Sequence, residues 1–285
     1  MSLESLRAQI LHWSSLPPDE LRARREEALP TLSHLLHELS VGRLRAAEPC
    51  PDGSWQTHPW IKQGILLCFL LGRLRPYRIG AWRFTDVDTL SLRWFSPDER
   101  VRLVPGGSAV RSGAYIAPGV VCMPPMYINV GAYVDEGTMV DSHVLIGSCA
   151  QIGKRVHLSA GAQIGGVLEP PQARPVIVED EAFIGANCGL FEGVLIRRRA
   201  VIAAGVQLTA TTPVYDLVHE RILTGTPDEP VEIPEAAVVI PGCRQIDSPF
   251  ARTHGLGIAT PVIVKYRTPQ TDARTALETA LRAML

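Results

Sequence analysis

Apolar residues recur at every sixth position through the middle of this chain. Starting from Val104, all eleven residues taken at this spacing up to Ile164 are apolar, and the spacing resumes at Val178 and continues to Leu208. A second column, four residues after each member of the first, carries no charge from Ser108 to 168. A period of six fits neither an α-helix nor a single strand. It is typical of hexapeptide repeats, whose short parallel strands stack into a β-helix with the apolar columns inside.

The repeat is interrupted once, over residues 165–177. The step from Ile164 to Val178 is 14 residues instead of six, and the segment contains Pro170, Pro171 and Pro175. An insertion into a stacked repeat must leave the stack, so we predict an external loop here. Loops held on rigid scaffolds often carry function.

The flanks of the repeat follow other patterns. Residues 1–45 keep helical spacing; Pro17-Pro18 should end a first helix, Asp19 should cap a second that ends near 29, and Thr31 should cap a third. Residues 60–71 form a helix that is apolar nearly all round, hence buried. Strands are expected at 238–240 and 262–264, and a helix at 275–285.

These patterns predict a mainly β fold. Its centre is a left-handed parallel β-helix over residues 101–240, with the external loop at 165–177. An α-helical N-terminal domain covers 1–100, and a small C-terminal strand and helix segment covers 241–285.

Composition narrows the class of protein. The 28 Lys and Arg residues nearly balance the 29 Asp and Glu residues, which gives no reason to expect nucleic acid or a membrane as a partner. The longest apolar run, 65–71, is far shorter than the roughly 20 residues that span a bilayer. No signal peptide is visible, and the six cysteines form no C-x-x-C pair. We expect a cytoplasmic protein with reduced thiols.

Particular motifs within and beside the repeats indicate which family of β-helix proteins this chain resembles. The segments YVDEGTMVD at 133–141, GSCAQIG at 147–153, VHL at 156–158 and IGGVLEP at 164–170, with the Gln172-Ala173 pair, resemble the tetrahydrodipicolinate N-succinyltransferase family. The likeness extends to GRLRAA at 42–47, HPWIK at 58–62 and VIVK at 262–265, so it covers most of residues 40–266.

The resemblance implies an acyl-CoA-dependent N-acyltransferase without a metal, assembled as a homotrimer. It implies that acyl-CoA, either succinyl-CoA or acetyl-CoA, lies between neighbouring β-helices. It also implies that Arg102 and Asp141 bind the acceptor, and that Asp141 takes part in catalysis. Chemistry agrees: a guanidinium can grip a carboxylate of a dicarboxylate acceptor with two hydrogen bonds, and an amine nucleophile needs a carboxylate to orient it.

The chain departs from the family where the reaction is expected. Gly189 stands where the family has a catalytic Glu, and Ser142-His143 replaces Thr-Trp. His143 is a second candidate catalytic residue, because an imidazole is a suitable general base and, in an extended strand, its side chain would point to the same side as that of Asp141. These departures also suggest a diverged relative that uses acetyl-CoA in a specialised, tabtoxin-like pathway.

Small residues beside the apolar columns are candidates for binding acyl-CoA. Their backbone amides can face the pantetheine arm and their small side chains permit close approach. Lys265 is a candidate for the CoA phosphates, while the arginine run 197–199 is more typical of a solvated surface. The candidate cofactor-binding residues are Gly166, Gly185, Ala186, Ala204, Gly205 and Lys265.

Two other classes of function are open to a chain with this pattern. A zinc hydratase of the same fold needs three converging histidines, but His143 and His157 are isolated within the repeats. A CoA-binding protein without catalysis is an alternative that the loss of the Glu leaves open.

Overall fold

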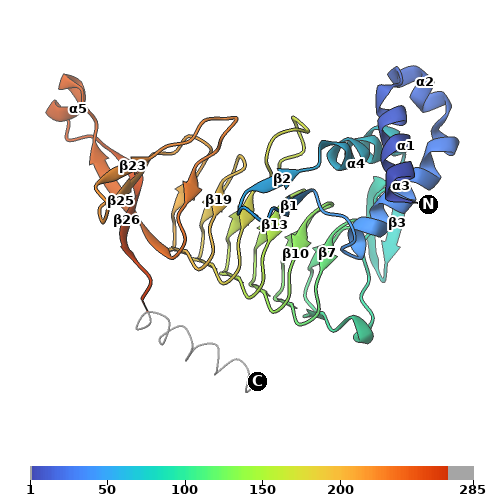
Figure 1. Ribbon diagram of the computed structural model, residues 1–285. Helices are drawn as coiled ribbons and strands as arrows, with labels where there is room; N and C mark the ends of the chain where they lie inside the picture. Colours follow the sequence, from blue (N-terminus) through green and yellow to red (C-terminus); the bar gives the residue numbers. More distant parts are fainter. Residues whose placement is uncertain (1, 269–285) are drawn as a thin grey trace.

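A triangular prism of short parallel strands forms the centre of the molecule (Figure 1). The computed structural model describes residues 2–268. Strands of two residues alternate with corners, and most strands pair with the strand 18 residues later, as Tyr133 does with Gln151. Stacking therefore makes three parallel faces, and the predicted left-handed β-helix fold class is confirmed.

We call the three sides of the prism the first, second and third face. The first face contains β5(Arg102–Leu103), β8(Val121–Cys122), β11(Met139–Val140), β14(His157–Leu158), β17(Phe183–Ile184) and β20(Val201–Ile202). The second face contains β6(Ala109–Val110), β9(Tyr127–Ile128), β12(Leu145–Ile146), β15(Gln163–Ile164), β18(Gly189–Leu190) and β21(Gln207–Leu208). The third face contains β7(Tyr115–Ile116), β10(Tyr133–Val134), β13(Gln151–Ile152), β16(Ile177–Val178), β19(Leu195–Ile196) and β24(Glu232–Ile233).

The predicted apolar columns form the core of the prism, with two corrections. From Val110 to Leu208 every member of the first column is buried. At the start, however, Leu103 and not Val104 is in register with Cys122, because the segment 105–107 adds one residue to the first coil. At the end of the second column, Val167 enters this core, whereas Leu168 packs against the helical domain.

Four helices form the N-terminal domain: α1(Leu3–Ser15), α2(Pro18–Ala23), α3(Arg25–Ser40) and α4(Pro59–Leu71). The buried helix expected at 60–71 is α4. The predicted break at Pro30 is wrong, since α3 continues through it. A proline removes one helix hydrogen bond, and burial of Leu32, Leu35 and Leu39 on the same helix offsets that loss.

The helical domain packs on the corner between the second and third faces, which we call the second corner. Gly131 has φ +78°, and a Cβ atom there would lie 2.8 Å from Cδ1 of Ile65 on α4. Val130 and Cys149, in the same corner, belong to the apolar core of the helical domain. Glycine at 131 thus permits both the tight turn and the approach of the helix.

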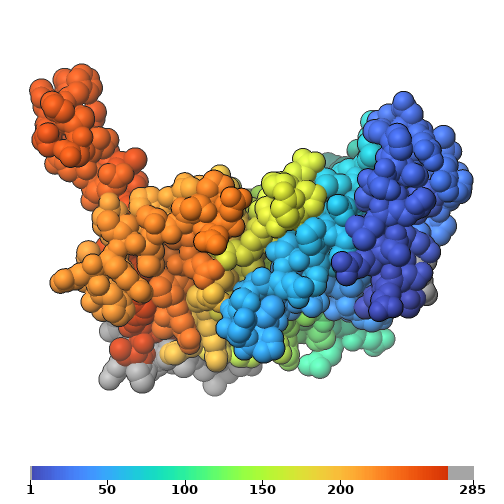
Figure 2. Space-filling model, turned by 45° about the horizontal axis from the view of Figure 1, so that its top comes forward, coloured from blue at the N-terminus to red at the C-terminus, as the bar shows by residue number. Residues whose placement is uncertain are grey.

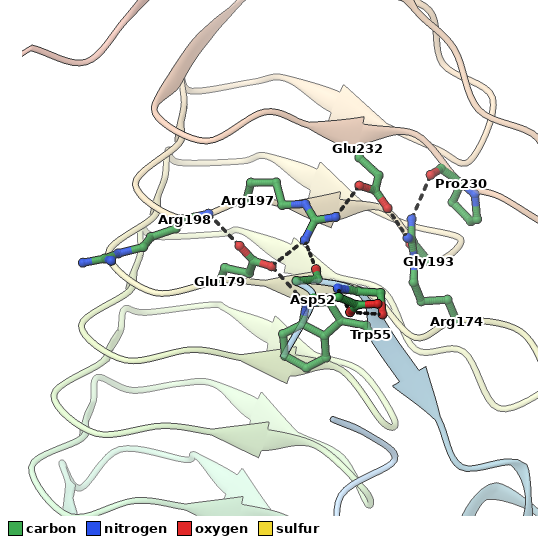
Figure 3. A network of polar contacts seen from close by, with 11 residues as sticks. Asp52, Trp55, Arg174, Glu179, Gly193, Arg197, Arg198, Pro230 and Glu232 are labelled. Atoms are coloured by element: carbon green, nitrogen blue, oxygen red, sulfur yellow. Dashed lines mark hydrogen bonds and ion pairs between the residues drawn. The ribbon is translucent and has the colours of Figure 1, made fainter. Parts of the chain in front are cut away.

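The third face is covered by the chain itself. The hairpin of β1(Ala47–Pro49) and β2(Trp55–Thr57) lies across it (Figures 1 and 2). Glu179 accepts hydrogen bonds from Trp55 Nε1 (2.9 Å) and Arg197 Nη1 (3.0 Å), and Arg197 also donates to Gly53 O (2.6 Å; Figure 3). Arg198 pairs with Glu181 at 3.0 Å. Arg197 therefore helps to fix the hairpin on the third face, whereas the pair of Arg198 with Glu181 is more exposed.

Two hairpins project from the ends of the prism. One is formed by β3(Leu74–Ile79) and β4(Trp82–Val87), followed by the short helix η1(Pro97–Glu99). The other is formed by β25(Ala237–Gln245) and β26(Gly257–Tyr266), with α5(Pro249–Thr253) at its tip, away from the body of the molecule (Figures 1 and 2). β25 and β26 contain the strands predicted at 238–240 and 262–264. β22(Val214–Asp216) pairs with β26, and β23(Arg221–Leu223) pairs with the other edge of β22.

Two predictions concern the C-terminal helix and the absence of a membrane-spanning helix. The helix predicted at 275–285 lies outside the described residues. No helix within residues 2–268 combines the length and apolar character that crossing a bilayer requires.

Candidate functional site

The candidate residues concentrate at the corner between the first and second faces, which we call the first corner. Each coil turns here after its first-face strand, and in the four turns after β11, β14, β17 and β20 one residue adopts a left-handed backbone conformation. The residues in that position are His143 (φ 62°), Gly161 (φ 73°), Asn187 (φ 55°) and Gly205 (φ 80°). Their amides join successive coils; for example, Gly205 N donates to Ala186 O at 2.9 Å. The corner is thus a rigid ridge along the prism.

Asp141 lies at the start of this corner, directly after β11. Its backbone N–H donates to Leu158 O at 3.0 Å, and its Oδ1 accepts the N–H of Ser142 at 2.7 Å. The side chain is half-buried and its other oxygen, Oδ2, has no hydrogen-bond partner within residues 2–268. The corner therefore fixes a carboxylate with one oxygen available to a ligand.

Arg102 lies on the same face as Asp141. It is on β5, opposite Val121, which in turn is opposite Met139 on β11. At about 4.8 Å per strand, the two strands are about 10 Å apart along the prism axis. Arg102 is exposed and forms no ion pair with any described residue. A dicarboxylate a few bonds long can reach from the guanidinium to the region of Asp141.

His143 does not lie as the extended-strand argument predicts. β11 ends at Val140, and residues 141–143 form the turn, with His143 in the left-handed region and its N–H donating to Pro125 O at 2.5 Å. The alternation of side chains along a strand therefore does not apply, and the expected common direction of Asp141 and His143 has no basis in the local backbone. His143 remains two residues from Asp141, on the same corner, and is exposed.

Four of the candidate cofactor-binding residues lie together on the first corner. Gly185 and Ala186 follow β17, and Ala204 and Gly205 follow β20 on the next coil. A Cβ atom on Gly185 would overlap the backbone N of Ala204, so this position requires glycine. The amides of Gly185 and Gly205 donate within the prism, to Ile202 O and Ala186 O. Among these four, only the N–H groups of Ala186 and Ala204 have no partner within the described chain.

The other two candidate cofactor-binding residues lie elsewhere. Gly166 follows β15, at the second corner, where the external loop leaves the prism; its backbone packs directly against Gly147. Lys265 is on β26, opposite Val238 of β25, and is exposed. The fold thus separates the six residues into a group of four, one residue across the second face, and one at the C-terminal hairpin.

The position of the family's Glu is occupied by other side chains. A Cβ atom on Gly189 would overlap Oε1 of Gln207, on the next coil, and the ring of Phe191. Gln207 is held in place because its Nε2 donates to Asn187 O at 2.9 Å. The side chain of Asn187 packs against Gly161, because a Cβ atom on Gly161 would overlap Oδ1 of Asn187.

Sequence reasoning missed Asn187 and Gln207 as candidate site residues. One signal was present for Asn187: it takes the same place in its coil as Gly161 and Gly205, where a left-handed residue is needed, and asparagine tolerates that conformation. Gln207 gave no such signal, because its contact with Gly189 joins two coils and depends on their register.

No group of three or more His, Cys, Asp or Glu side chains that could hold a metal ion occurs within residues 2–268. The histidines of the repeats are separated along the prism: His143 is at the first corner and His157 stacks on Phe183 in the first face, with ring centroids 4.8 Å apart.

The family models and the curated relatives that this chain matches are all described as succinyltransferases. Residues 14–71 match the family described as tetrahydrodipicolinate N-succinyltransferase N-terminal, and residues 175–210 match the hexapeptide repeat of succinyl-transferase. A 2,3,4,5-tetrahydropyridine-2,6-dicarboxylate N-succinyltransferase of Nitrobacter hamburgensis is 40% identical, over 99% of this chain and 100% of the relative. The protein of the same name from Acinetobacter baylyi is 43% identical, over 93% and 91%. That from Bradyrhizobium diazoefficiens is 39% identical, over 99% and 100%.

Proposed function

We propose, from the premise that this chain belongs to the tetrahydrodipicolinate N-succinyltransferase family, that it transfers the succinyl group of succinyl-CoA to tetrahydrodipicolinate. Because the acceptor is a cyclic imine, water must first add to its C=N bond, and the nucleophile is the amino group of the hydrated or ring-opened form. The chain is an acyltransferase of that family, since its relatives match it over nearly their whole length. The relatives from Nitrobacter hamburgensis, Bradyrhizobium diazoefficiens and Acinetobacter baylyi all carry the succinyltransferase name, which favours succinyl-CoA over acetyl-CoA as the donor.

The reaction needs an oriented amine and a proton acceptor. In the proposed mechanism Arg102 binds a carboxylate of the acceptor, and the free oxygen of Asp141 accepts a hydrogen bond from the acceptor's amine. The amine nitrogen attacks the thioester carbonyl, a C–N bond forms, and the C–S bond breaks. His143 takes the amine proton, and the departing thiolate is protonated to give free CoA. No covalent intermediate with the protein is required.

The first corner supports a groove for the pantetheine arm. The N–H groups of Ala186 and Ala204, which have no partner within the described chain, are suited to donate hydrogen bonds to its amide oxygens, and the small residues Gly185 and Gly205 permit close approach. Gly166, across the second face, would line the opposite side, and Lys265 would meet phosphate groups. The arrangement along successive coils suits an extended ligand.

We further propose that the chain works as a homotrimer in the cytoplasm. The exposed apolar side chains of the C-terminal hairpin support the proposal that a partner subunit covers this hairpin. Phe250 is 68% exposed, and Leu256 and Ile258 are 45% and 44% exposed. Contiguous exposed apolar surface is typical of protein interfaces. Sedimentation should give the mass of three chains.

The proposal is tested by thiol release. Purified protein is mixed with tetrahydrodipicolinate and either succinyl-CoA or acetyl-CoA, and free CoA is measured. We expect release that requires the acceptor and strongly prefers succinyl-CoA. A preference for acetyl-CoA would overturn the proposed donor. Tight binding of CoA in calorimetry with no release, over a panel of amino dicarboxylates, would instead establish a binding protein without catalysis.

A further inference from the structure

A lysine is fully buried between the helical domain and the prism. Lys62, on α4, has 0% of its surface exposed, and its Nζ donates to the backbone O of Ala173 at 2.5 Å. No carboxylate of the described chain lies within ion-pair distance of it. Of the two other lysines in the sequence, neither Lys154 nor Lys265 is buried.

This burial is costly in free energy. Removing an ammonium group from water costs several kcal/mol unless a partner compensates for it, and burial lowers the pKa of Lys62. The neighbouring positions of α4 are filled by apolar side chains such as Ile61 and Ile65. An apolar residue at position 62 would fill the same space without that cost. What it could not provide is a donor for Ala173.

Ala173 belongs to the external loop, and the loop is anchored again at the next residue. Arg174 donates from Nε to Gly193 O (2.9 Å) and from Nη2 to Pro230 O (2.8 Å), and its Nη1 pairs with Glu232 (2.5 Å; Figure 3). Leu168, at the start of the loop, packs against the core of the helical domain. The loop is therefore fixed to the helical domain on one side and to the late part of the prism on the other.

The loop begins beside the proposed acyl-CoA groove. It leaves the prism at Gly166, and Val167 N donates to Ser148 O at 3.2 Å to close the turn. The second face lies between this turn and the first corner. A loop that shifted at Ala173 would therefore move one side of the groove while leaving Asp141 and the first corner unchanged.

We propose that Lys62 is a positioning residue that fixes the external loop for acyl-CoA binding, and so makes the helical domain part of the donor site. This inference rests on the proposed function for its kinetic consequence. Its structural part, the attachment of the loop by Lys62, can be tested separately.

The test compares Lys62→Met with Lys154→Met. Methionine keeps an unbranched side chain that is one atom shorter, and it removes the donor. Lys154 lies on the far corner between the third and first faces, so the same substitution there is a matched control. For Lys62→Met we expect the KM for succinyl-CoA to rise at least about tenfold, corresponding to about 1.4 kcal/mol, with kcat changed less than about threefold. Hydrogen exchange of residues 166–176 should accelerate, while that of α4 should not.

Arg174→Met provides a second variant that leaves the buried core intact, and it should raise the same KM. A KM for succinyl-CoA within about twofold of the unaltered protein, with unchanged exchange in the loop, would overturn the proposal. So would faster exchange of α4 with an unchanged KM, which indicates a purely structural role. If the unaltered protein releases no thiol from either donor, the proposed function fails, whereas loop exchange in Lys62→Met still decides whether the lysine holds the loop.

Discussion

Trp55 donates its indole N–H to Oε1 of Glu179 at 2.9 Å, joining two residues 124 positions apart in the sequence. The same carboxylate accepts from Arg197 and from the backbone N–H of Arg198 at 2.9 Å. One side chain of the prism thus holds the hairpin of β1 and β2 on the third face (Figure 3).

Glu179→Gln should detach this hairpin. The amide keeps one acceptor oxygen but places an NH2 group against donors, so we expect the free energy of unfolding to fall by about 1.5–3 kcal/mol. Hydrogen exchange of residues 47–57 should accelerate as well. Glu181→Gln is the control, because the pairs of Glu181 with Arg155 and Arg198 are more exposed and worth about 0–1 kcal/mol. Equal losses for the two variants would contradict this account.

His143 can be tested without straining the corner. Its φ of 62° suits glycine, so His143→Gly removes the imidazole while keeping the turn. If His143 takes the amine proton, kcat should fall at least about 100-fold in both His143→Gly and His143→Ala. A loss under about threefold would remove His143 from the mechanism, and a loss in the alanine variant alone would assign the effect to the backbone.

Restoring a Glu at position 189 should be hindered by Gln207. A side chain at 189 must displace the Gln207 amide and the ring of Phe191, so we expect Gly189→Glu to destabilise the protein by about 1–3 kcal/mol. Adding Gln207→Ala should recover part of that loss, because Phe191 remains in place. The measurement is a double-mutant cycle by chemical denaturation. Strict additivity of the two substitutions would show that the side chains do not compete for space.

Asp216 should make the protein sensitive to acid. Burial alone would raise its pKa, but hydrogen bonds from His219 (2.9 Å), Tyr266 (2.8 Å) and Arg221 (3.0 Å) outweigh burial and lower the pKa below its usual value. The stabilising contribution is therefore fully present above about pH 4 and is lost as the pH falls towards the lowered pKa.

Asp216→Asn should accordingly lower the free energy of unfolding by about 1.5–3 kcal/mol at neutral pH. The difference from the unaltered protein should shrink below about pH 4, as measured by urea denaturation at several pH values. Asp247→Asn, which alters an ion pair with Arg252 at the tip of the projecting hairpin, should change neither quantity. A difference that stays constant down to pH 2 would refute the role given to Asp216.

The errors in the sequence-based reading have local causes. The helix break at Pro30 was predicted from backbone preference, but burial of the surrounding leucines outweighs one missing hydrogen bond. The direction of His143 was predicted from strand alternation, but β11 is only two residues long and the chain has already turned at Asp141. In a strand of two residues, the alternation of side chains cannot be extended to residues beyond the strand.

The sequence by itself determined the prism, the external loop and the family. The six-residue apolar period recurs in every coil, a break in it marks the loop, and short motifs of neighbouring residues identify the family. Only the tertiary structure decided which side chains meet. Gln207 fills the space at Gly189, Lys62 reaches Ala173, and Glu179 holds Trp55. Each of these contacts joins residues from different coils or domains, so it depends on register and packing, which no local pattern encodes.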